Sequence, residues 1–119
     1  MSPSESSRSG SPEPWRVAVA EFQREVRALY GPRLVRVILY GSRARGDAEE
    51  GSDIDLMVVL KDAVNVWSEL DRMNPISSRL SLEHNVVITT IPIEEREYQE
   101  RRSPLLLNVR REGVPVDAL

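Results

Sequence analysis

The chain has 119 residues, a length that is sufficient for one domain with its own core. Its formal net charge of -3 at pH 7 argues against nucleic-acid binding through a broad basic surface. It has no cysteine and a single histidine, His84, so disulfides, thiolate metal sites and histidine-rich zinc sites are excluded. No apolar run approaches the roughly 20 residues of a membrane span, and the first residues lack the apolar segment of a secretory signal, so we expect a cytoplasmic protein.

The chain begins with a segment, Met1–Pro12, that is rich in serine, proline and glycine. Such a composition buries too little apolar surface to offset chain entropy, so we expect a disordered tail before a single domain over residues 13–119. From Trp15 on, apolar residues recur at spacings of four and three. This pattern predicts an amphipathic helix that begins near Pro14 and ends at Gly31.

Two short apolar runs follow, separated by polar residues. Val35–Tyr40 is rich in β-branched residues and predicts a strand that Gly41 ends. Ser42–Arg45 fits a short helix, and Asp47–Ser52 fits a polar loop. We expect the second strand over Asp53–Leu60, because a nearly continuous apolar run suits a strand at the centre of a sheet.

The middle of the chain predicts a long helical segment and a third strand. Asp62 or Asn65 can cap a helix that runs to about Leu80. Pro75 interrupts its pattern, so we expect a kink or two short helices there. The run Asn85–Ile91 predicts the third strand.

The sequence pattern predicts helices in the last part of the chain, after the third strand. We expect Pro92 to end the third strand and a charged helix to follow over Ile93–Arg101. Ser103 and Pro104 are residue types that cap and open a helix, and Gly113 ends it. The alternation of helices and strands predicts an α/β (α+β) fold, a small mixed sheet of three or four strands with helices mainly on one face.

Two aspartates at the start of the second strand carry the clearest chemical signal. Asp53 and Asp55 are two positions apart, so in a strand they project to the same face while Ile54 turns away. Neighbouring carboxylates repel each other unless a cation lies between them, and Mg²⁺ prefers such oxygen ligands together with water and substrate phosphates. The alternative is a pair of solvated acids at the end of a strand.

A glycine and a serine lie upstream of the aspartates, with ten residues between Ser42 and Asp53. Gly41 lets the backbone approach a phosphate closely. The first amides of the helix that follows, together with the Ser42 hydroxyl, can bind an anion. The pair has little weight alone, but between two apolar strands and ahead of the aspartates it predicts a phosphate-binding turn that faces a divalent-metal site.

Neighbouring side chains extend the candidate nucleotide-binding set. Arg43 and Arg45 can add positive charge against a triphosphate, because a guanidinium binds phosphate oxygens in a forked manner. Arg45 has an equally good alternative in an ion pair with Asp47 or Glu49. Ser52, which opens the second half of the motif, completes the set of candidate nucleotide-binding residues.

Residues 41–46 (GSRARG) and 52–56 (SDIDL) resemble the minimal nucleotidyltransferases (MNT) of the DNA polymerase beta-like superfamily. The resemblance extends over most of the chain and implies the polymerase beta-like fold, with magnesium and ATP. It also implies that Gly41 and Ser42 hold the phosphates, and that Asp53 and Asp55 are catalytic residues that bind two Mg²⁺ ions during transfer.

The family pattern places a third carboxylate on the next strand, and this chain departs from it. Asn85 falls at the expected acidic position, and an amide is a weaker ligand and no base. Glu83, two residues earlier on the same face of the expected strand, is a candidate catalytic substitute, although a solvated glutamate is the alternative. His84 would point to the opposite face of that strand.

Small members of this family resemble the antitoxins of HEPN/MNT toxin–antitoxin pairs. That resemblance implies transfer of AMP from ATP to a tyrosine hydroxyl of a HEPN toxin, which silences the toxin. Two alternatives stay open: an antitoxin with weak catalysis that acts by binding its partner, and transfer to a small molecule. Template-directed polymerisation fits neither the length nor the acidic balance of the chain.

Overall fold

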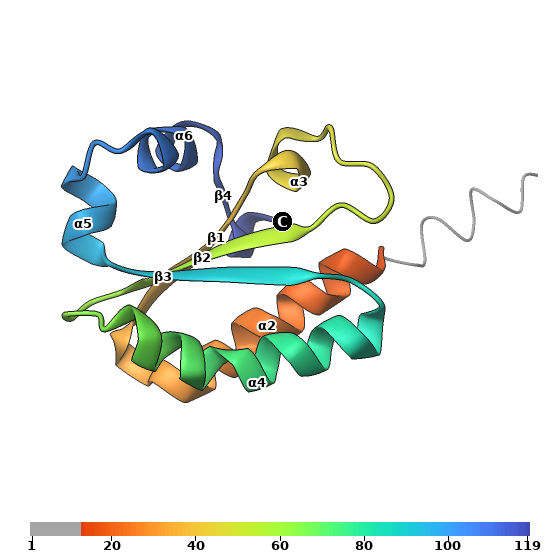
Figure 1. Ribbon diagram of the computed structural model, residues 1–119, viewed down its shortest axis with the longest axis horizontal. Helices are drawn as coiled ribbons and strands as arrows, with labels where there is room; N and C mark the ends of the chain where they lie inside the picture. Colours follow the sequence, from red (N-terminus) through yellow and green to blue (C-terminus); the bar gives the residue numbers. More distant parts are fainter. Residues whose placement is uncertain (1–12) are drawn as a thin grey trace, which may run out of the picture.

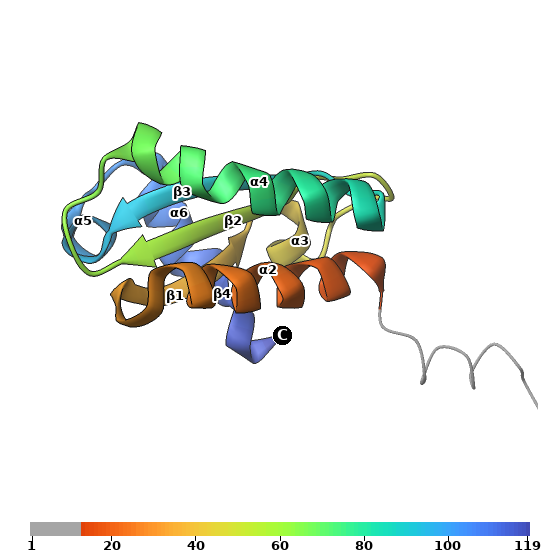
Figure 2. The ribbon, with the colours of Figure 1, turned by 90° about the horizontal axis from the view of Figure 1, so that it is seen from below.

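The computed structural model describes residues 13–119, and the expected tail, Met1–Pro12, lies outside the described residues. A mixed four-stranded sheet with the order β3-β2-β1-β4 forms the centre of the fold. Two long helices, α2 and α4, cover one face, and the short helices α5 and α6 lie on the other (Figures 1 and 2). The predicted α/β fold with a small mixed sheet is confirmed.

The strands are β1 (Leu34–Tyr40), β2 (Ile54–Leu60), β3 (Ile88–Glu94) and β4 (Val114–Pro115). The helices are α2 (Pro14–Tyr30), α3 (Ser42–Arg45), α4 (Val66–His84), α5 (Glu95–Glu100) and α6 (Pro104–Glu112). Short 3₁₀ turns cover Gly31–Arg33 and Val116–Ala118. Within the part of the chain that the structure describes, no helix has the length and apolar character needed to cross a bilayer.

Side chains of β2 point alternately to the two faces of the sheet, and each face packs against different helices. Ile54, Leu56 and Val58 are fully buried and pack in one cluster with α2 and α4. Met57 and Val59 belong to a second cluster with α6 on the opposite face. Because side chains alternate along a strand, the two aspartates that precede Met57 share its face, away from the long helices.

The first helix follows its predicted pattern closely. Its buried residues recur at helical spacing and lie against the sheet: Trp15, Ala18, Val19, Phe22, Val26 and Tyr30. Pro14 occupies the first turn, where its missing N–H is not needed. Gly31 then takes φ +56°, a backbone conformation that ends the helix at the predicted residue.

Helix α4 is longer and more continuous than its sequence indicates. It runs from Val66 to His84 as one helix that includes Pro75, where a kink or a break was expected. Asn65, one of the two predicted caps, accepts a hydrogen bond from the Ser68 amide at 3.1 Å. Pro75 is exposed, and the buried residues on either side of it, Met73 and Leu80, hold the helix against the sheet.

The predicted start and end of the third strand were both wrong. Asn85 ends α4 with φ +53°, a left-handed conformation that asparagine tolerates, so the strand begins only at Ile88. Pro92 lies inside β3. Because β3 is at the edge of the sheet, a residue without an N–H is compatible with the strand. The short strand β4 was not predicted, since two residues leave no pattern.

Shortening a side chain in the main core should weaken the fold. Leu56 is fully buried at the centre of the sheet, whereas Leu82 is 86% exposed. We expect Leu56→Ala to lower the free energy of unfolding by about 2–5 kcal/mol and Leu82→Ala to change it by less than about 0.5 kcal/mol. Urea denaturation followed by circular dichroism measures both, and equal effects would contradict this assignment of the core.

Candidate functional site

The centre of the candidate site is a contact between Gly41 and Asp55. Register pairs Tyr40 on β1 with Asp55 on β2, so the turn after β1 lies beside the Asp55 carboxylate. Gly41 has φ +76° and ψ -157°, a region almost restricted to glycine. A Cβ at Gly41 would collide with Oδ2 of Asp55. Glycine is therefore favoured here for two reasons: the backbone conformation, and the Asp55 carboxylate oxygen, which a Cβ would have to displace.

The turn presents backbone amides at the start of α3. The amides of Ala44 and Arg45 both donate to the Gly41 carbonyl, at 3.1 Å each. The amides of Ser42 and Arg43 precede this first hydrogen-bonded turn and have no helical acceptor. Gly41, Ser42 and Arg43 are each partly exposed. The turn expected at these residues is therefore present and partly exposed, and its binding of phosphate stays a prediction.

The two aspartates lie at the start of β2 on the open face of the sheet. Asp53 immediately precedes the strand and is exposed, and Asp55 is its second residue and is partly buried. Two acids at such spacing on one face, one of them against the Gly41 turn, match the oxygen ligands that Mg²⁺ prefers. The donor set fits a magnesium ion that also binds phosphate oxygens held at the turn.

Thr89 is the site residue that sequence reasoning overlooked. Register places Thr89 of β3 opposite Asp55, and its hydroxyl donates to Oδ1 of Asp55 at 2.7 Å. With Oδ2 beside Gly41, the carboxylate is held from both neighbouring strands. The third strand was expected to begin at Asn85, three residues before its observed start at Ile88, and the candidates for a residue near the aspartates were therefore Asn85 and Glu83.

Glu83, the predicted catalytic substitute, lies outside this arrangement. It is in the last turn of α4, because the helix continues to His84 where a strand was expected, and its carboxylate accepts from Arg79 at 3.1 Å. Its placement on a strand was wrong, and so was that of Asn85, which ends the helix.

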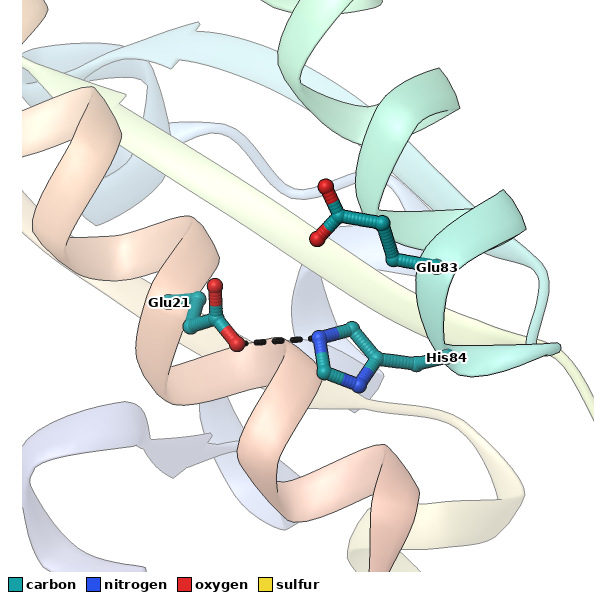
Figure 3. A group of neighbouring side chains, drawn as sticks. All are labelled: Glu21, Glu83 and His84. Atoms are coloured by element: carbon teal, nitrogen blue, oxygen red, sulfur yellow. Dashed lines mark hydrogen bonds and ion pairs between the residues drawn. The ribbon is translucent and has the colours of Figure 1, made fainter.

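Figure 3 shows Glu83 with its neighbours Glu21 and His84, where α4 faces α2. His84 Nε2 is 2.9 Å from a carboxylate oxygen of Glu21, and Arg79 also pairs with Glu25 of α2. The ligand atoms of Glu21, Glu83 and His84 lie within 4.8 Å of one another. Because arginine or histidine pairs each acid, the cluster is explained as a bridge between two helices.

The two arginines of the motif are held by protein groups. The Arg43 guanidinium donates to the Ser52 carbonyl at 3.2 Å and lies 5.3 Å from the centre of the Trp15 ring. Arg45 pairs with Asp47 at 3.2 Å and with Glu112 at 3.7 Å. This favours the ion-pair interpretation of Arg45, while a phosphate contact of Arg43 stays a prediction.

Ser52 shapes the loop that leads to the aspartates. Its hydroxyl accepts from the Glu49 amide at 2.9 Å, and its own amide donates to the Glu49 carbonyl at 3.0 Å. These bonds close the loop on itself, and the Arg43 contact with the Ser52 carbonyl ties it to α3. Ser52 thus positions Asp53 through the backbone, and its predicted contact with nucleotide stays a prediction.

Tyr40 lies beside Asp55 and remains neutral. Burial, and after it the negative charge of Asp55, raises the pKa of the Tyr40 phenol to about 12. At neutral pH the phenol therefore keeps its proton and adds no second negative charge next to the carboxylate. The side chain also packs against the smaller apolar cluster under α6.

Comparison with known proteins identifies the family of the chain. Residues 19–117 match the family described as "Nucleotidyltransferase domain". A protein of Methanocaldococcus jannaschii named "Putative protein adenylyltransferase" is 36% identical over 73 residues, which are 61% of this chain and 73% of the relative. The match confirms the family that the motif predicted.

Solved structures of other proteins have a fold similar to that of this chain. A structure described as "putative minimal nucleotidyltransferase" is 29% identical with a TM-score of 0.52, covering 84% of this chain and 87% of the other. A toxin–antitoxin crystal structure with AMP-PNP gives a TM-score of 0.58 at 17% identity, covering 85% and 71%. At that identity the second likeness shows the fold alone.

Adding a methyl group at Gly41 should damage ligand binding beyond its effect on stability. Gly41→Ala strains the backbone and displaces Asp55, whereas Gly46→Ala at φ +83° strains the backbone with nothing within 4 Å of the new Cβ. Each substitution should cost about 1–3 kcal/mol of stability, but only Gly41→Ala should weaken Mg²⁺-dependent binding of a non-hydrolysable ATP analogue, by about tenfold or more. Calorimetric titration compares the two, and equal losses of affinity would contradict the proposed contact.

Removing the Thr89 hydroxyl should loosen Asp55. We expect Thr89→Val to weaken Mn²⁺ binding to the protein by about 10- to 100-fold, the usual effect of losing a partner that orients a metal ligand. Thr89→Ser keeps the hydroxyl and should retain most of the affinity. Electron paramagnetic resonance of added Mn²⁺ measures both variants, and identical affinities would show that the hydrogen bond has no role in metal binding.

Proposed function

The chain belongs to the nucleotidyltransferase domain family, and on this premise we propose that it transfers AMP from Mg²⁺-bound ATP to a hydroxyl group of a partner protein. The observation that carries the proposal is the contact of Asp55 with the Gly41 turn. This contact would bring the phosphate-binding turn and the metal-binding carboxylates of the proposal together at the start of β2. The α-phosphate of a nucleotide held by the turn would lie within reach of both.

The choice of ATP and of a protein acceptor has separate support. A structure with a similar fold was crystallised with AMP-PNP, an analogue of ATP. The name of the M. jannaschii relative specifies transfer of adenylyl groups to protein. These observations favour an adenine nucleotide and a protein hydroxyl over other triphosphates and small acceptors.

In this proposal the residues of the site bind and orient the nucleotide. The amides of Ser42 and Arg43 and the Ser42 hydroxyl hold phosphate oxygens of the leaving pyrophosphate. Asp53 and Asp55 would hold magnesium, which when bound neutralises charge on the phosphates and favours attack by a hydroxyl. Thr89 and the Gly41 turn keep the Asp55 carboxylate in one orientation, so that less reorganisation is needed during transfer.

We propose further that the acceptor is a tyrosine of a HEPN toxin and that the protein acts as its antitoxin. The motif over residues 41–56 carries this part of the proposal, because it resembles the MNT antitoxins. A toxin–antitoxin complex described as MntA-HepT has a similar fold, with a TM-score of 0.53 at 14% identity. AMP on the tyrosine hydroxyl would add negative charge and bulk at the toxin.

A second candidate function follows from the residue opposite Asp55. Thr89 occupies the strand position nearest that carboxylate, and a threonine hydroxyl is a poor base at neutral pH. Transfer would then be slow, and the protein could neutralise its partner by forming a stable complex. Measuring protection and transfer with the same variants separates the two functions.

Replacing Asp53 should abolish transfer and leave the fold intact. Asp53→Asn keeps the shape of the side chain but removes the charge that binds metal, so we expect at least about a 100-fold lower rate of AMP transfer. The assay supplies α-labelled ATP, Mg²⁺ and the protein encoded by the neighbouring gene, and follows label on that protein.

The control is Asp71→Asn, at an exposed position of α4, which should transfer at the normal rate. Unchanged labelling by Asp53→Asn would refute the proposed mechanism. Protection without any labelling by the unsubstituted protein would establish the binding function instead.

A further inference from the structure

A short series of contacts joins the main core to the first of the two aspartates. The loop from Asp47 to Ser52 leads directly to Asp53, and both of its ends are attached to α3. At its start, the Asp47 amide donates to a carbonyl of α3 at 3.2 Å. At its end, the Arg43 guanidinium donates to the Ser52 carbonyl, also at 3.2 Å.

The hydrogen bond from Arg43 acts on the peptide group that precedes Asp53. The Ser52 carbonyl and the Asp53 amide belong to one planar unit, so a donor that fixes the carbonyl also fixes the plane that contains the Asp53 nitrogen and Cα. Asp53 is exposed and lies before the first residue of β2, whereas Asp55 is held through its own carboxylate by Thr89. The position of Asp53 therefore depends on the loop before it and on the contact that holds the end of that loop.

The middle of this loop has open space beside it. A hollow of about 630 Å³ lies between the loop, the start of α2 and the end of α4. Its lining includes residues 48–51 of the loop, together with Trp15 and Arg43. The two hydrogen bonds that close the loop on itself give it a shape but do not attach it to another element. The attachments to α3 at the two ends therefore restrain the approach to Asp53.

The Arg43 guanidinium is held in turn by Trp15. Its central carbon lies 5.3 Å from the centre of the Trp15 ring, within the range at which the electron-rich face of an indole attracts a cation. Trp15 is only 8% exposed and belongs to the main core cluster, and its indole N–H donates to Glu13 at 3.0 Å. The ring is a fixed support, because packing and a hydrogen bond both restrain it.

The same packing limits what else Arg43 can bind. Its Nε is buried and makes no hydrogen bond within the part of the chain that the structure describes. A phosphate oxygen could reach this nitrogen only if the side chain moved away from its present neighbours. One N–H group that a forked phosphate contact can use is thus enclosed, and Nη2 already donates to the Ser52 carbonyl. This geometry favours a contact with protein over a contact with nucleotide.

We infer that Arg43 is a positioning residue for Asp53, rather than a ligand of phosphate, and that Trp15 supports its guanidinium. The contacts run from the core through the ring, the guanidinium and the Ser52 carbonyl to the backbone of Asp53. They set the position of a predicted metal ligand before its side chain begins. This inference rests on the metal-binding role of Asp53 in the proposed function.

Binding of Mn²⁺ to the full chain without nucleotide tests the role of Arg43. Arg43→Met keeps the length of the side chain but removes the donor and one positive charge. Losing a positive charge near the aspartates would by itself favour a bound cation, so a weaker affinity reports the loss of position. We expect Arg43→Met to weaken Mn²⁺ binding by about tenfold, measured by electron paramagnetic resonance of added Mn²⁺.

Arg16→Met is the matched control. The Arg16 guanidinium also lies near the Trp15 ring, 4.7 Å from its centre, but its ion pair is with Glu13 of the same segment. This variant removes the same charge from beside the same ring without removing the contact with the loop. Its Mn²⁺ affinity should stay within about twofold of the original, and equal affinities of the two variants would overturn the inference.

A double-mutant cycle tests the support by Trp15. We expect Trp15→Leu, which removes the aromatic face, to weaken Mn²⁺ binding by about threefold or more, and Trp15→Phe to retain most of the affinity. In the Arg43→Met background the further loss from Trp15→Leu should be less than about twofold, because the contact is already absent. Independent losses would show that the ring does not act through the guanidinium. The comparison of Arg43→Met with Arg16→Met decides the role of Arg43 even if Trp15→Leu fails to fold.

The outcomes separate this inference from the proposed function. If Arg43→Met leaves Mn²⁺ affinity unchanged but weakens binding of α,β-methylene ATP, Arg43 contacts phosphate and the inference is wrong. If the unsubstituted protein binds Mn²⁺ but transfers no AMP, the proposed function fails and the two arginine variants still decide the inference. A lack of saturable Mn²⁺ binding by the unsubstituted protein would overturn both.

Discussion

The whole site depends on the space that Gly41 leaves for the carboxylate of Asp55. The β1–β2 register brings the turn and the acid together, and the absence of a side chain lets them touch. Thr89 then holds the other carboxylate oxygen from β3. Two neighbouring strands therefore fix the orientation of one acid, Asp55, which is the predicted metal ligand.

One face of the sheet forms the main core, and the other face carries the candidate site. Alternate residues of β2 are buried under α2 and α4, so the main core forms without involving the aspartates. The opposite face is covered in part by α5 and α6, and Asp53 is exposed while Asp55 is partly buried there. A chain of this size can combine a stable core with an open site because each strand contributes to both.

The helical layer explains charged residues that the site does not use. Glu21, Glu25, Arg79 and His84 join the two long helices through ion pairs at the edge of the core. Glu83 belongs to this group through Arg79. The acidic and basic residues near the end of α4 are thus accounted for by contacts between helices. The predicted metal-binding residues Asp53 and Asp55 lie elsewhere, at the start of β2.

Local patterns in the sequence determined the first helix, the strands at Gly41 and Asp55, and the motif that identifies the family, because helical spacing, strand alternation and turn residues act over short stretches. Those patterns left open where α4 ends, since Asn85 can continue a strand or close a helix. In the structure Asn85 closes the helix, so Glu83 belongs to α4 and Thr89 is the residue opposite Asp55. Only the tertiary structure settled it, because the pairing of β2 with β3 depends on the packing of the whole of α4 against the sheet, and such long-range register leaves no trace in neighbouring residues.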